Sequence, residues 1–345
     1  MVSDFYEFDF LDLLDNDLEE YSEDWIETEC EIINSLSEHE LIWLFSALPL
    51  KEMWLFSHLC KKTLKCQSRF LKRVEKVDIA MRGPHVGKML DLILNGCPNI
   101  ESLRVYKYFY AEREHFPKIS GILANCSNLK SFVGWLTEGV LSRCTKKKLS
   151  LRKVFIDMSE TGNLKTHLEK FEELEELVLR SRDSRGVSHA NMENIGDLFK
   201  TAPSLTKLSI RSIYMTDEVK KKLTMNKNLT HFEIIGGGYC DEDVDYLSRR
   251  LPYLTHIGLC GNELTKKGVK SIRDNIKRLH SLDIMVASCD SCEETFRFLC
   301  EKENFSELRF LYVRKWPVSW TEQFLRSKPL CKVVDFDMWR ISFEN

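Results

Sequence analysis

Two cysteines near residue 290 are the side chains best suited to metal chemistry. Cys289 and Cys292 have the spacing of one pair of zinc ligands, and His280 and Cys300 lie nearby in the sequence. A structural zinc ion takes four ligands in recognisable spacing, commonly as two such pairs. Because a second pair is missing, we interpret these cysteines as a chance pair in a loop, with a zinc site as the alternative. We therefore expect no metal and no other cofactor.

Motifs that would indicate catalysis are missing from the sequence. Its glycine run, residues 236–238, is followed by Tyr239 and Cys240, whereas a phosphate-binding loop needs Lys and then Ser or Thr. We interpret the run as a turn between a strand and a helix. The chain has no His-Glu-x-x-His and no Gly-x-Ser-x-Gly motif, and its nine histidines are dispersed. The sequence therefore predicts a protein that is not an enzyme.

Clusters of basic residues are candidate contacts for an anionic partner. Residues 180–186 read Arg-Ser-Arg-Asp-Ser-Arg-Gly, and residues 146–148 and 220–222 are runs of lysine. The arginines could bind an acidic or phosphorylated segment, although a solvated loop is the favoured interpretation. The lysine runs lack the interleaved aromatic side chains of a platform for single-stranded nucleic acid. Binding of nucleic acid is therefore not expected.

Charge is distributed unevenly along the 345 residues. Residues 1–50 contain 15 acidic and no basic side chains, whereas the remainder contains 50 basic and 38 acidic ones. An acidic head and a basic body require separate explanations. The sequence shows no signal-peptide pattern and no apolar run of membrane-spanning length. Its 12 cysteines follow no framework spacing, so we expect reduced thiols, a location in the cytoplasm or the nucleus, and no membrane partner.

The acidic head, residues 1–35, alternates acidic residues with large apolar ones such as Phe5, Phe8, Leu11 and Trp25. Repulsion among the carboxylates, with no cation to offset it, disfavours an independent fold. The alternation is typical of a disordered segment that binds partners. A solubilising tail, or a partly helical extension docked on the rest of the chain, is an equally good interpretation.

Residues 36–77 have the pattern of a small helical unit. Ser37 and Glu40 form a capping-box pattern, in which each side chain bonds the backbone amide of the other residue at a helix start. Apolar residues follow at helical spacing, and Pro49 is expected to end this first helix. The apolar pattern continues beyond Pro49 as far as Leu59. About 40 residues form only a thin core, so the unit is expected to need a partner.

The order of residues in this unit resembles an F-box. The resemblance rests on Leu36-Ser37-Glu38-His39-Glu40-Leu41, on Leu44-Phe45, on Leu48-Pro49-Leu50-Lys51-Glu52 and on Leu59-Cys60-Lys61. Two positions depart from the family pattern, since Ser37 stands where proline is usual and Thr63 where tryptophan is often found. The alternative is a helical cap on the rest of the chain, which does not explain the residue order.

An F-box implies a partner and a task. Members of the family bind the Skp adaptor, which links them to a cullin scaffold and a RING subunit. The resemblance implies a subunit of an SCF-type ubiquitin ligase that selects substrates while other subunits perform the chemistry. It assigns adaptor binding to apolar residues of this unit, some of which must form the unit's own core instead: Leu36, Leu41, Leu44, Leu48, Pro49, Leu50 and Leu59.

Residues 78–345 repeat the pattern apolar–x–x–apolar–x–apolar. Examples are Ile100/Leu103/Val105, Leu205/Leu208/Ile210 and Leu254/Ile257/Leu259, and a final copy is Cys331/Val334/Phe336. About ten copies recur with a mean period of about 26 residues, as in leucine-rich repeats, which each combine a strand with a returning helix. Cys97 and Cys126, each just before a predicted strand, resemble the cysteine-containing repeats common behind F-boxes. The sequence therefore predicts an α/β leucine-rich-repeat solenoid, preceded by a small all-α F-box.

One face of the predicted sheet is expected to bind the substrate. Because strand side chains alternate between faces, the apolar positions point into the core and the intervening ones to the concave surface. We expect an unidentified protein substrate, with an acidic or phosphorylated segment, to bind there on Arg104, Tyr106, Trp135, Phe155, Arg180, Lys207, Arg211, His231, His256, Phe310, Tyr312 and Arg314. A register shifted by one residue would instead bury Phe155 or Trp135. The acidic head is a second candidate occupant because its charge is opposite.

Two other functions remain open on the sequence alone. The chain could be a leucine-rich-repeat scaffold unrelated to ubiquitin, for example a nuclear adaptor whose acidic head recruits transcription or transport factors. A solenoid that binds nucleic acid through the basic body is the third. Retention of the Skp adaptor and a cullin would distinguish the first function, and steeply salt-dependent binding would mark the last.

Overall fold

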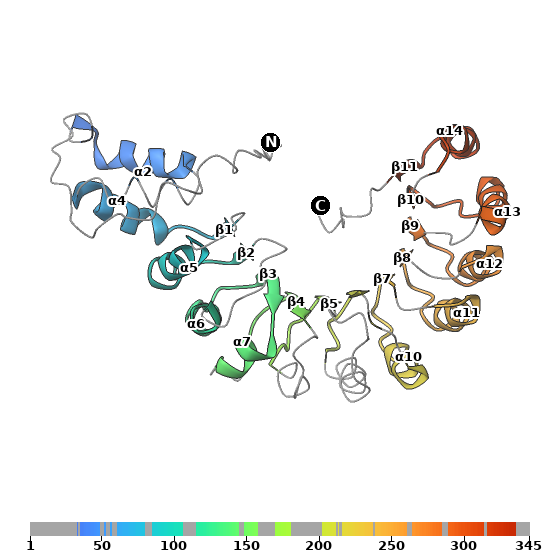
Figure 1. Ribbon diagram of the computed structural model, residues 1–345, viewed down its shortest axis with the longest axis horizontal. Helices are drawn as coiled ribbons and strands as arrows, with labels where there is room; N and C mark the ends of the chain where they lie inside the picture. Colours follow the sequence, from blue (N-terminus) through green and yellow to red (C-terminus); the bar gives the residue numbers. More distant parts are fainter. Residues whose placement is uncertain are drawn as a thin grey trace. The chain divides into compact units, whose positions relative to one another are not determined.

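The chain divides into two compact units, residues 1–73 and 74–345. The computed structural model (Figure 1) describes residues 33, 35–48, 52, 56, 61–79, 85–105, 115–144, 148–157, 170–180, 202–211, 213, 216–236, 239–260, 264–284, 289–313 and 316–335. No helix within these ranges combines the length and the apolar character that crossing a bilayer requires.

The first unit contains the helices α2 (Glu38–Ala47) and α4 (Lys61–Leu71). The capping box is confirmed: the Ser37 hydroxyl accepts from the Glu40 amide at 3.2 Å, and the Glu40 carboxylate accepts from the Ser37 amide at 2.6 Å. Helix α2 ends at Ala47 with Leu48 as its C-cap, one residue before Pro49, which itself lies outside the described residues.

Helices α2 and α4 pack against each other through a few large side chains. Leu41 and Phe45 of α2 are buried, and the Phe45 ring stacks on Phe70 of α4 with 6.2 Å between ring centroids. At the surface, Glu38 of α2 forms ion pairs with Lys65 and Arg69 of α4. These contacts form the described part of the core between α2 and α4.

The second unit is built on one parallel sheet. The described residues form 11 strands, in which each strand pairs with the next along the chain: β1 (Lys76–Ile79), β2 (Ser102–Val105), β3 (Ser131–Leu136), β4 (Lys153–Asp157), β5 (Glu176–Arg180), β6 (Lys207–Arg211), β7 (His231–Ile235), β8 (His256–Cys260), β9 (Ser281–Ile284), β10 (Phe310–Val313) and β11 (Lys332–Asp335). Leu103, Leu177, Leu208 and Leu282 are fully or almost fully buried, as are the matching residues of the other central strands.

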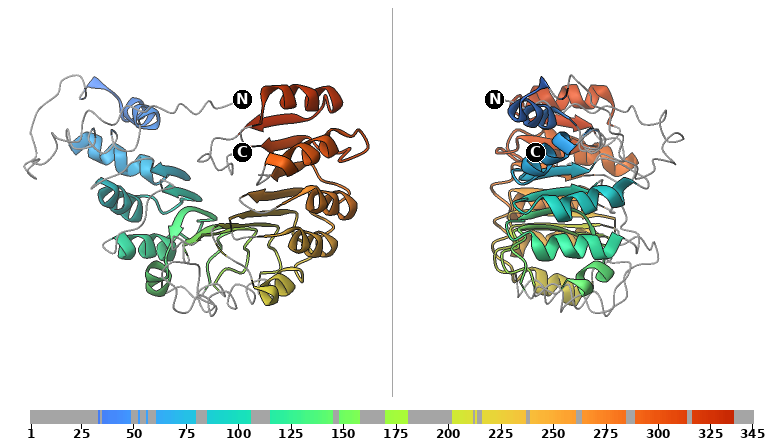
Figure 2. Two further views of the ribbon diagram at one scale, coloured as in Figure 1. Left: turned by 45° about the vertical axis from the view of Figure 1, so that its right-hand side comes forward. Right: turned by 90° about the vertical axis from the view of Figure 1, so that its left-hand side faces the viewer.

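Helices return the chain from one strand to the next. Those within the described residues are α5 (His85–Gly96), α6 (Phe116–Asn125), α7 (Glu138–Arg143), α10 (Asp217–Leu223), α11 (Asp241–Arg250), α12 (Lys266–Asn275), α13 (Cys289–Cys300) and α14 (Val318–Ser327). In this unit the strands line the inner side of a curve and the helices its outer side, as Figures 1 and 2 show. The predicted α/β solenoid with a strand and a helix per repeat is confirmed.

A ladder of shared carbonyl groups fixes the spacing of the repeats. The carbonyl before one strand accepts from two successive amides of the next repeat: Glu75 from residues 101 and 102, Glu175 from residues 206 and 207, and Thr230 from residues 255 and 256. Cys97 directly follows α5 and Cys126 directly follows α6. Both are buried, and the Cys126 thiol contacts the Cys97 carbonyl at 3.6 Å. Burial, with a further contribution from Cys126, raises the pKa of Cys97 to about 12.

The structure corrects the two ends of the predicted repeat array. Strand β1 precedes the first predicted copy and lies across the expected boundary between residues 77 and 78, so the sheet has one strand more than the ten copies predicted. At the other end, β11 pairs Val333 with Leu311 and Val334 with Tyr312. Val334 therefore shares the face of Tyr312, and the predicted final copy was displaced by one residue.

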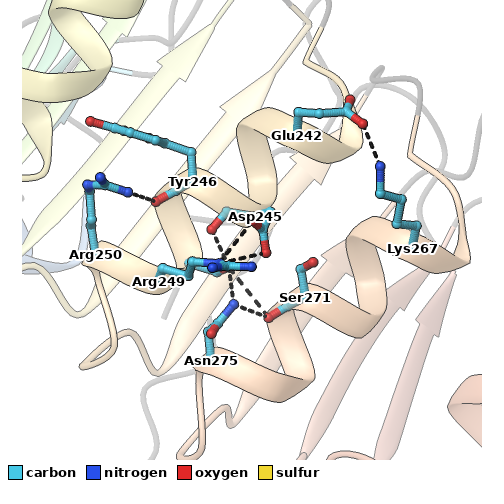
Figure 3. A network of polar contacts seen from close by, with 9 residues as sticks. Glu242, Asp245, Tyr246, Arg249, Arg250, Lys267, Ser271 and Asn275 are labelled. Carbon is cyan, nitrogen blue, oxygen red and sulfur yellow. Dashed lines mark hydrogen bonds and ion pairs between the residues drawn. The ribbon is translucent and has the colours of Figure 1, made fainter.

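Polar contacts cover the outer face of the solenoid at α11 and α12. Figure 3 shows Glu242 of α11 paired with Lys267 of α12 at 2.6 Å, and Arg249 paired with Asp245 on the same helix at 2.9 Å. Exposed pairs of this kind contribute little to stability. The inner face of the sheet and the exposed face of α2 carry the residues that the sequence assigns to binding.

Candidate functional site

The exposed face of α2 centres on a tryptophan. Trp43 is 67% exposed and lies on the side of the helix opposite Leu41 and Phe45, because two residues turn an α-helix by about 200°. The other exposed residues of the helix are small or polar: His39, Glu40, Ser46 and Ala47. A large aromatic side chain in the middle of such a face is a candidate anchor for a partner.

The structure sorts the residues predicted to bind the adaptor. Leu41 is fully buried, so it supports the unit's own core and cannot contact a partner directly, which corrects its assignment. Leu36, Leu44 and Leu48 are partly exposed, and Pro49, Leu50 and Leu59 lie outside the described residues. Trp43 was missed, although its position opposite Leu41 and Phe45 on a helical wheel was available from the spacing alone.

On the inner face of the sheet, equivalent residues of neighbouring strands form rows. We call the row formed by the first strand position the first row: Lys153, Glu176, Lys207, His231, His256, Ser281 and Phe310, each paired in register with the next. The second row lies two residues further along each strand and includes Phe155, Val178, Ser209, Glu233, Gly258, Asp283 and Tyr312. The predicted inward and outward positions are therefore in the expected register here.

Phe155 lies on the inner face and is nevertheless buried. It is 8% exposed and packs with the fully buried Val178 and with Val133, so three neighbouring strands contribute to one apolar cluster. Val154 and Ile156 on either side of Phe155 point into the main core. The predicted face is thus correct, but Phe155 stabilises the sheet surface and offers little area to a ligand. For Trp135 only the backbone is described, paired with Phe155.

Arg211 on β6, which was expected to be free to bind a ligand, belongs to a buried polar network. Arg211 is 8% exposed, and its Nε donates to the Ser209 hydroxyl at 3.2 Å while its guanidinium lies 3.7 Å from the Glu233 carboxylate. The Ser209 hydroxyl in turn donates to Glu233 at 2.7 Å. Gly258 makes room for this arrangement, since a Cβ there would lie 2.8 Å from Cγ of Glu233. The assignment of Arg211 to the ligand-binding set is corrected accordingly.

His231 and His256 of the first row stack on each other. Their ring centroids are 3.8 Å apart and the rings are inclined by 11°, whereas His280 meets His256 edge-on at 6.4 Å. Burial, supplemented by the charges of His256 and Lys207, lowers the pKa of His231 to about 4. Burial also lowers the pKa of His256, with smaller contributions from His280 and Lys207. Both rings are therefore neutral at pH 7.

Acidification is expected to destabilise the second unit through these two histidines. An unfolded histidine titrates near pH 6.5, whereas folded His231 titrates near pH 4, so the unfolded chain binds more protons between these values. The free energy of unfolding should therefore be at its full value above pH 6.5 and decrease as the pH drops from 6.5 towards 4. Denaturant unfolding at pH 7, 6 and 5 checks this, with His231→Gln/His256→Gln expected to lose less stability over that range. Parallel losses in the variant and the wild type would contradict it.

The remaining predicted ligand-binding residues are spread along the sheet. Arg104 of β2 is exposed and lies 3.6 Å from Asp78 of β1, and Arg180 ends β5 half-buried. Phe310 of β10 is 39% exposed and stacks on the half-buried Tyr312, with 6.4 Å between ring centroids. Tyr106 and Arg314 lie outside the described residues.

The charge of the inner face is more balanced than the basic composition of the body suggests. Lys153 pairs with Glu176 at 2.7 Å, Arg104 with Asp78, and Arg211 with Glu233. Lys207 differs from these cations, since the described part of the chain offers its ammonium group no ion pair or hydrogen bond. Lys332, which continues this row on β11, likewise forms no ion pair among the described residues, but of these two lysines only Lys207 lies beside the stacked histidines.

The candidate zinc pair lies in a helix. Helix α13 begins at Cys289, so Cys289 and Cys292 occupy its first turn, which corrects their placement in a loop. Their side chains are outside the described set. Among the side chains that are described, no group of three or more His, Cys, Asp or Glu residues is arranged to hold a metal ion.

These observations define the second unit as a leucine-rich-repeat solenoid, and comparisons of the whole chain agree with that fold. No protein-family model matches the chain. Rad7, from the crystal structure of the yeast Rad7 and Elc1 complex, matches 88% of this chain and 89% of its own at 14% identity, with a TM-score of 0.54. At that identity the likeness concerns the fold alone.

Two further solved structures resemble parts of the chain. The C-terminal domain of tropomodulin from Caenorhabditis elegans matches 40% of this chain and 89% of its own at 15% identity, with a TM-score of 0.32. A protein from Bacteroides fragilis matches 61% of this chain and 74% of its own at 15% identity, with a TM-score of 0.42.

Proposed function

We propose that the chain is the substrate-recognition subunit of an SCF-type ubiquitin ligase. Its helical unit would bind the Skp adaptor, and its solenoid would hold the substrate. The observation that carries this proposal is the exposed Trp43 at the centre of α2, within the stretch whose residue order resembles an F-box. The second unit supports it because repeat solenoids present extended inner surfaces for binding.

In this proposal the chain is not a catalyst, and its contribution is positional. The adaptor and cullin would hold the chain near a charged ubiquitin-conjugating enzyme, while the inner face of the sheet keeps the substrate there. Tethering two reactants in one assembly raises their effective concentration, which accelerates transfer without any new catalytic group. Rad7, which shares the fold, was crystallised in a complex with Elc1, and this supports a role for such a chain within an assembly.

Co-elution with the purified Skp adaptor tests the proposal. The full chain mixed with the adaptor and a cullin is expected to elute as one complex in size-exclusion chromatography. The variant Leu48→Ala/Pro49→Ala should elute separately, because it alters the end of α2 next to its exposed face. Its far-ultraviolet circular dichroism should remain that of the wild type, since most helices and strands belong to the second unit. Separate elution of the wild-type chain would instead favour a repeat scaffold unrelated to ubiquitin.

A further inference from the structure

Lys207, His231 and His256 stand side by side in the first row of the inner face. The register pairs Lys207 with His231 and His231 with His256, so the three residues lie on consecutive strands, which are about 4.8 Å apart in a sheet. All three are partly exposed. The row continues into Ser281 and then Phe310, so this polar group borders the aromatic pair of β10.

Each histidine is held by the threonine that precedes it. Nδ1 of His231 lies 2.8 Å from the Thr230 hydroxyl, and Nδ1 of His256 lies 2.8 Å from the Thr255 hydroxyl. Each hydroxyl group also lies within hydrogen-bond distance of a backbone carbonyl, Thr230 of Thr206 at 3.2 Å and Thr255 of Thr230 at 3.3 Å. These contacts fix the orientation of both rings, with Nδ1 directed at the threonine.

The charges around the two rings do not neutralise Lys207. Lys207 and Arg211 face them from β6, Glu233 from their own strand β7, and Asp283 and His280 from the side of β9. Glu233 is engaged by Ser209 and Arg211, and His280 lies 3.5 Å from Glu307. On the other side of Lys207, its register partner Glu176 on β5 is paired with Lys153 at 2.7 Å. An unneutralised ammonium group thus borders two stacked rings, and its charge disfavours their protonation.

We propose that Lys207, His231 and His256 form an anion-binding site, which takes a carboxylate or phosphate group from a segment of a bound protein and takes up protons as it does so. The anion neutralises Lys207 and favours the imidazolium form of both rings. Protonation makes both nitrogens of each ring N–H donors and gives the ring a positive charge, so each proton taken up strengthens the charge-assisted hydrogen bonds to the ligand. The inference deepens the proposed function and rests on it only for the ligand's role as a substrate.

A protein segment fits this surface better than nucleic acid does. Glu233 and Asp283 lie in the second row of the same strands, and their carboxylates disfavour a continuous polyanion. One or two anionic side chains above Lys207 avoid them, and an apolar side chain of the same segment can reach Phe310, which is 39% exposed. The occupant is therefore an acidic or phosphorylated protein segment that also carries an apolar residue.

Fluorescence anisotropy with rhodamine-labelled octapeptides tests the site in the full chain. The probes contain a central Glu-Glu, phosphoserine or Gln-Gln pair followed by Phe, and an oligothymidine of similar length serves as the nucleic-acid probe. If binding returns one histidine from about pH 4 to its ordinary pKa, the Glu-Glu probe should bind roughly 10- to 30-fold more tightly at pH 5 than at pH 7. The phosphoserine probe should gain less, because phosphate itself loses charge below about pH 6.

Matched variants distinguish binding at this site from non-specific electrostatic attraction between the chain and an anionic peptide. Lys207→Ala should weaken binding of the Glu-Glu probe at both pH values, Lys207→Arg should retain it, and His231→Gln/His256→Gln should remove the pH dependence. Lys332→Ala, in the same row on β11, should bind as the wild type does. Calorimetry in buffers of different ionisation enthalpy should show proton uptake by the wild type and none by the histidine variant.

Several results would overturn the proposal. One is an affinity for the Glu-Glu probe that does not change with pH, or no binding of that probe at all. Others are a loss of affinity in Lys332→Ala equal to that in Lys207→Ala, binding of the Gln-Gln probe as tight as that of the Glu-Glu probe, and tighter binding of the oligothymidine than of either peptide. Adaptor co-elution is measured on the same variants. If Lys207→Ala loses the probe and keeps the adaptor, both proposals stand. If the wild type binds the probe but never the adaptor, the ligase assignment fails and the anion site remains.

Discussion

Reversing the charge of Arg211 is expected to lower the free energy of unfolding by about 3–5 kcal/mol, the range for breaking a buried ion pair. Arg211→Glu would place a carboxylate beside Glu233 and Ser209 at a position that is 8% exposed. Two carboxylates would then share a nearly water-free site. Urea denaturation of the variant and the wild type at pH 7 measures the difference directly.

The double variant Arg211→Glu/Glu233→Arg provides the control for this prediction. It restores opposite charges across β6 and β7, so it should recover part of the lost stability, and the double-mutant cycle isolates the pairwise contribution. The matched single change Arg104→Glu, on the exposed arginine of β2, should cost less than about 1 kcal/mol. Equal losses at Arg104 and Arg211 would show that burial of Arg211 is not the cause.

The residues that point into the core could be predicted because a strand has a side-chain period of two. Leu208 and Ile210 of β6 flank Ser209, and the same alternation places Lys207 and Arg211 on the inner face. Burial on that face could not be predicted in the same way. Arg211 is covered by Ser209 and Glu233, and Glu233 finds room because residue 258 of the next repeat is glycine. The burial of Arg211 on β6 thus depends on residues from the next repeat and from the one after it.

Phe155 illustrates the same limit for an apolar side chain. The repeat pattern assigns it correctly to the inner face, yet it packs there with Val133 and Val178 of the neighbouring strands. An aromatic residue at an outward position indicates a binding anchor only if its neighbours leave it exposed. Phe310 lies beside Ser281 in the first row and stacks on Tyr312, and it remains 39% exposed.

The basic composition of the body suggested a more cationic inner face than the structure has. Cations and carboxylates alternate between neighbouring repeats, as in Lys153 with Glu176 and Arg104 with Asp78. Pairs of this kind are more than 20 residues apart in the sequence, so net charge counts both partners without revealing the pairing. Among the described residues, the positive charge that is left without a carboxylate partner beside the stacked histidines is that of Lys207, so the inner face carries a local cationic position rather than a continuous cationic surface.

The capping box at Ser37 and Glu40 was evident from sequence because it depends on residues three apart. The core of the helical unit was harder to assign, since its members come from α2 and α4. Phe45 stacks on Phe70, and Leu41 is fully buried. The spacing within α2 separates Leu41 and Phe45 from Trp43, but it does not show which of the two sides packs against α4.

Replacing Trp43 is expected to have the largest effect on adaptor binding. Under the proposed function, Trp43→Ala should weaken binding of the Skp adaptor by at least about 30-fold, which corresponds to roughly 2 kcal/mol, because aromatic anchors at interface centres carry most of the binding energy. Trp43 is 67% exposed and contributes little to the core, so the variant should unfold at the same urea concentration as the wild type. Titration calorimetry with the purified adaptor measures the affinity.

Three comparisons decide whether Trp43 acts as an anchor. Trp43→Phe keeps an aromatic ring and should retain most of the affinity. Tyr253→Ala removes an aromatic side chain that is also 67% exposed, but in the second unit, and should leave adaptor binding unchanged. Leu41→Ala should lose adaptor binding together with stability, at a cost of about 2–5 kcal/mol for a fully buried leucine, so its loss of affinity should disappear when only the folded fraction is counted. Wild-type affinity in Trp43→Ala would exclude the exposed face of α2 as the adaptor-binding surface.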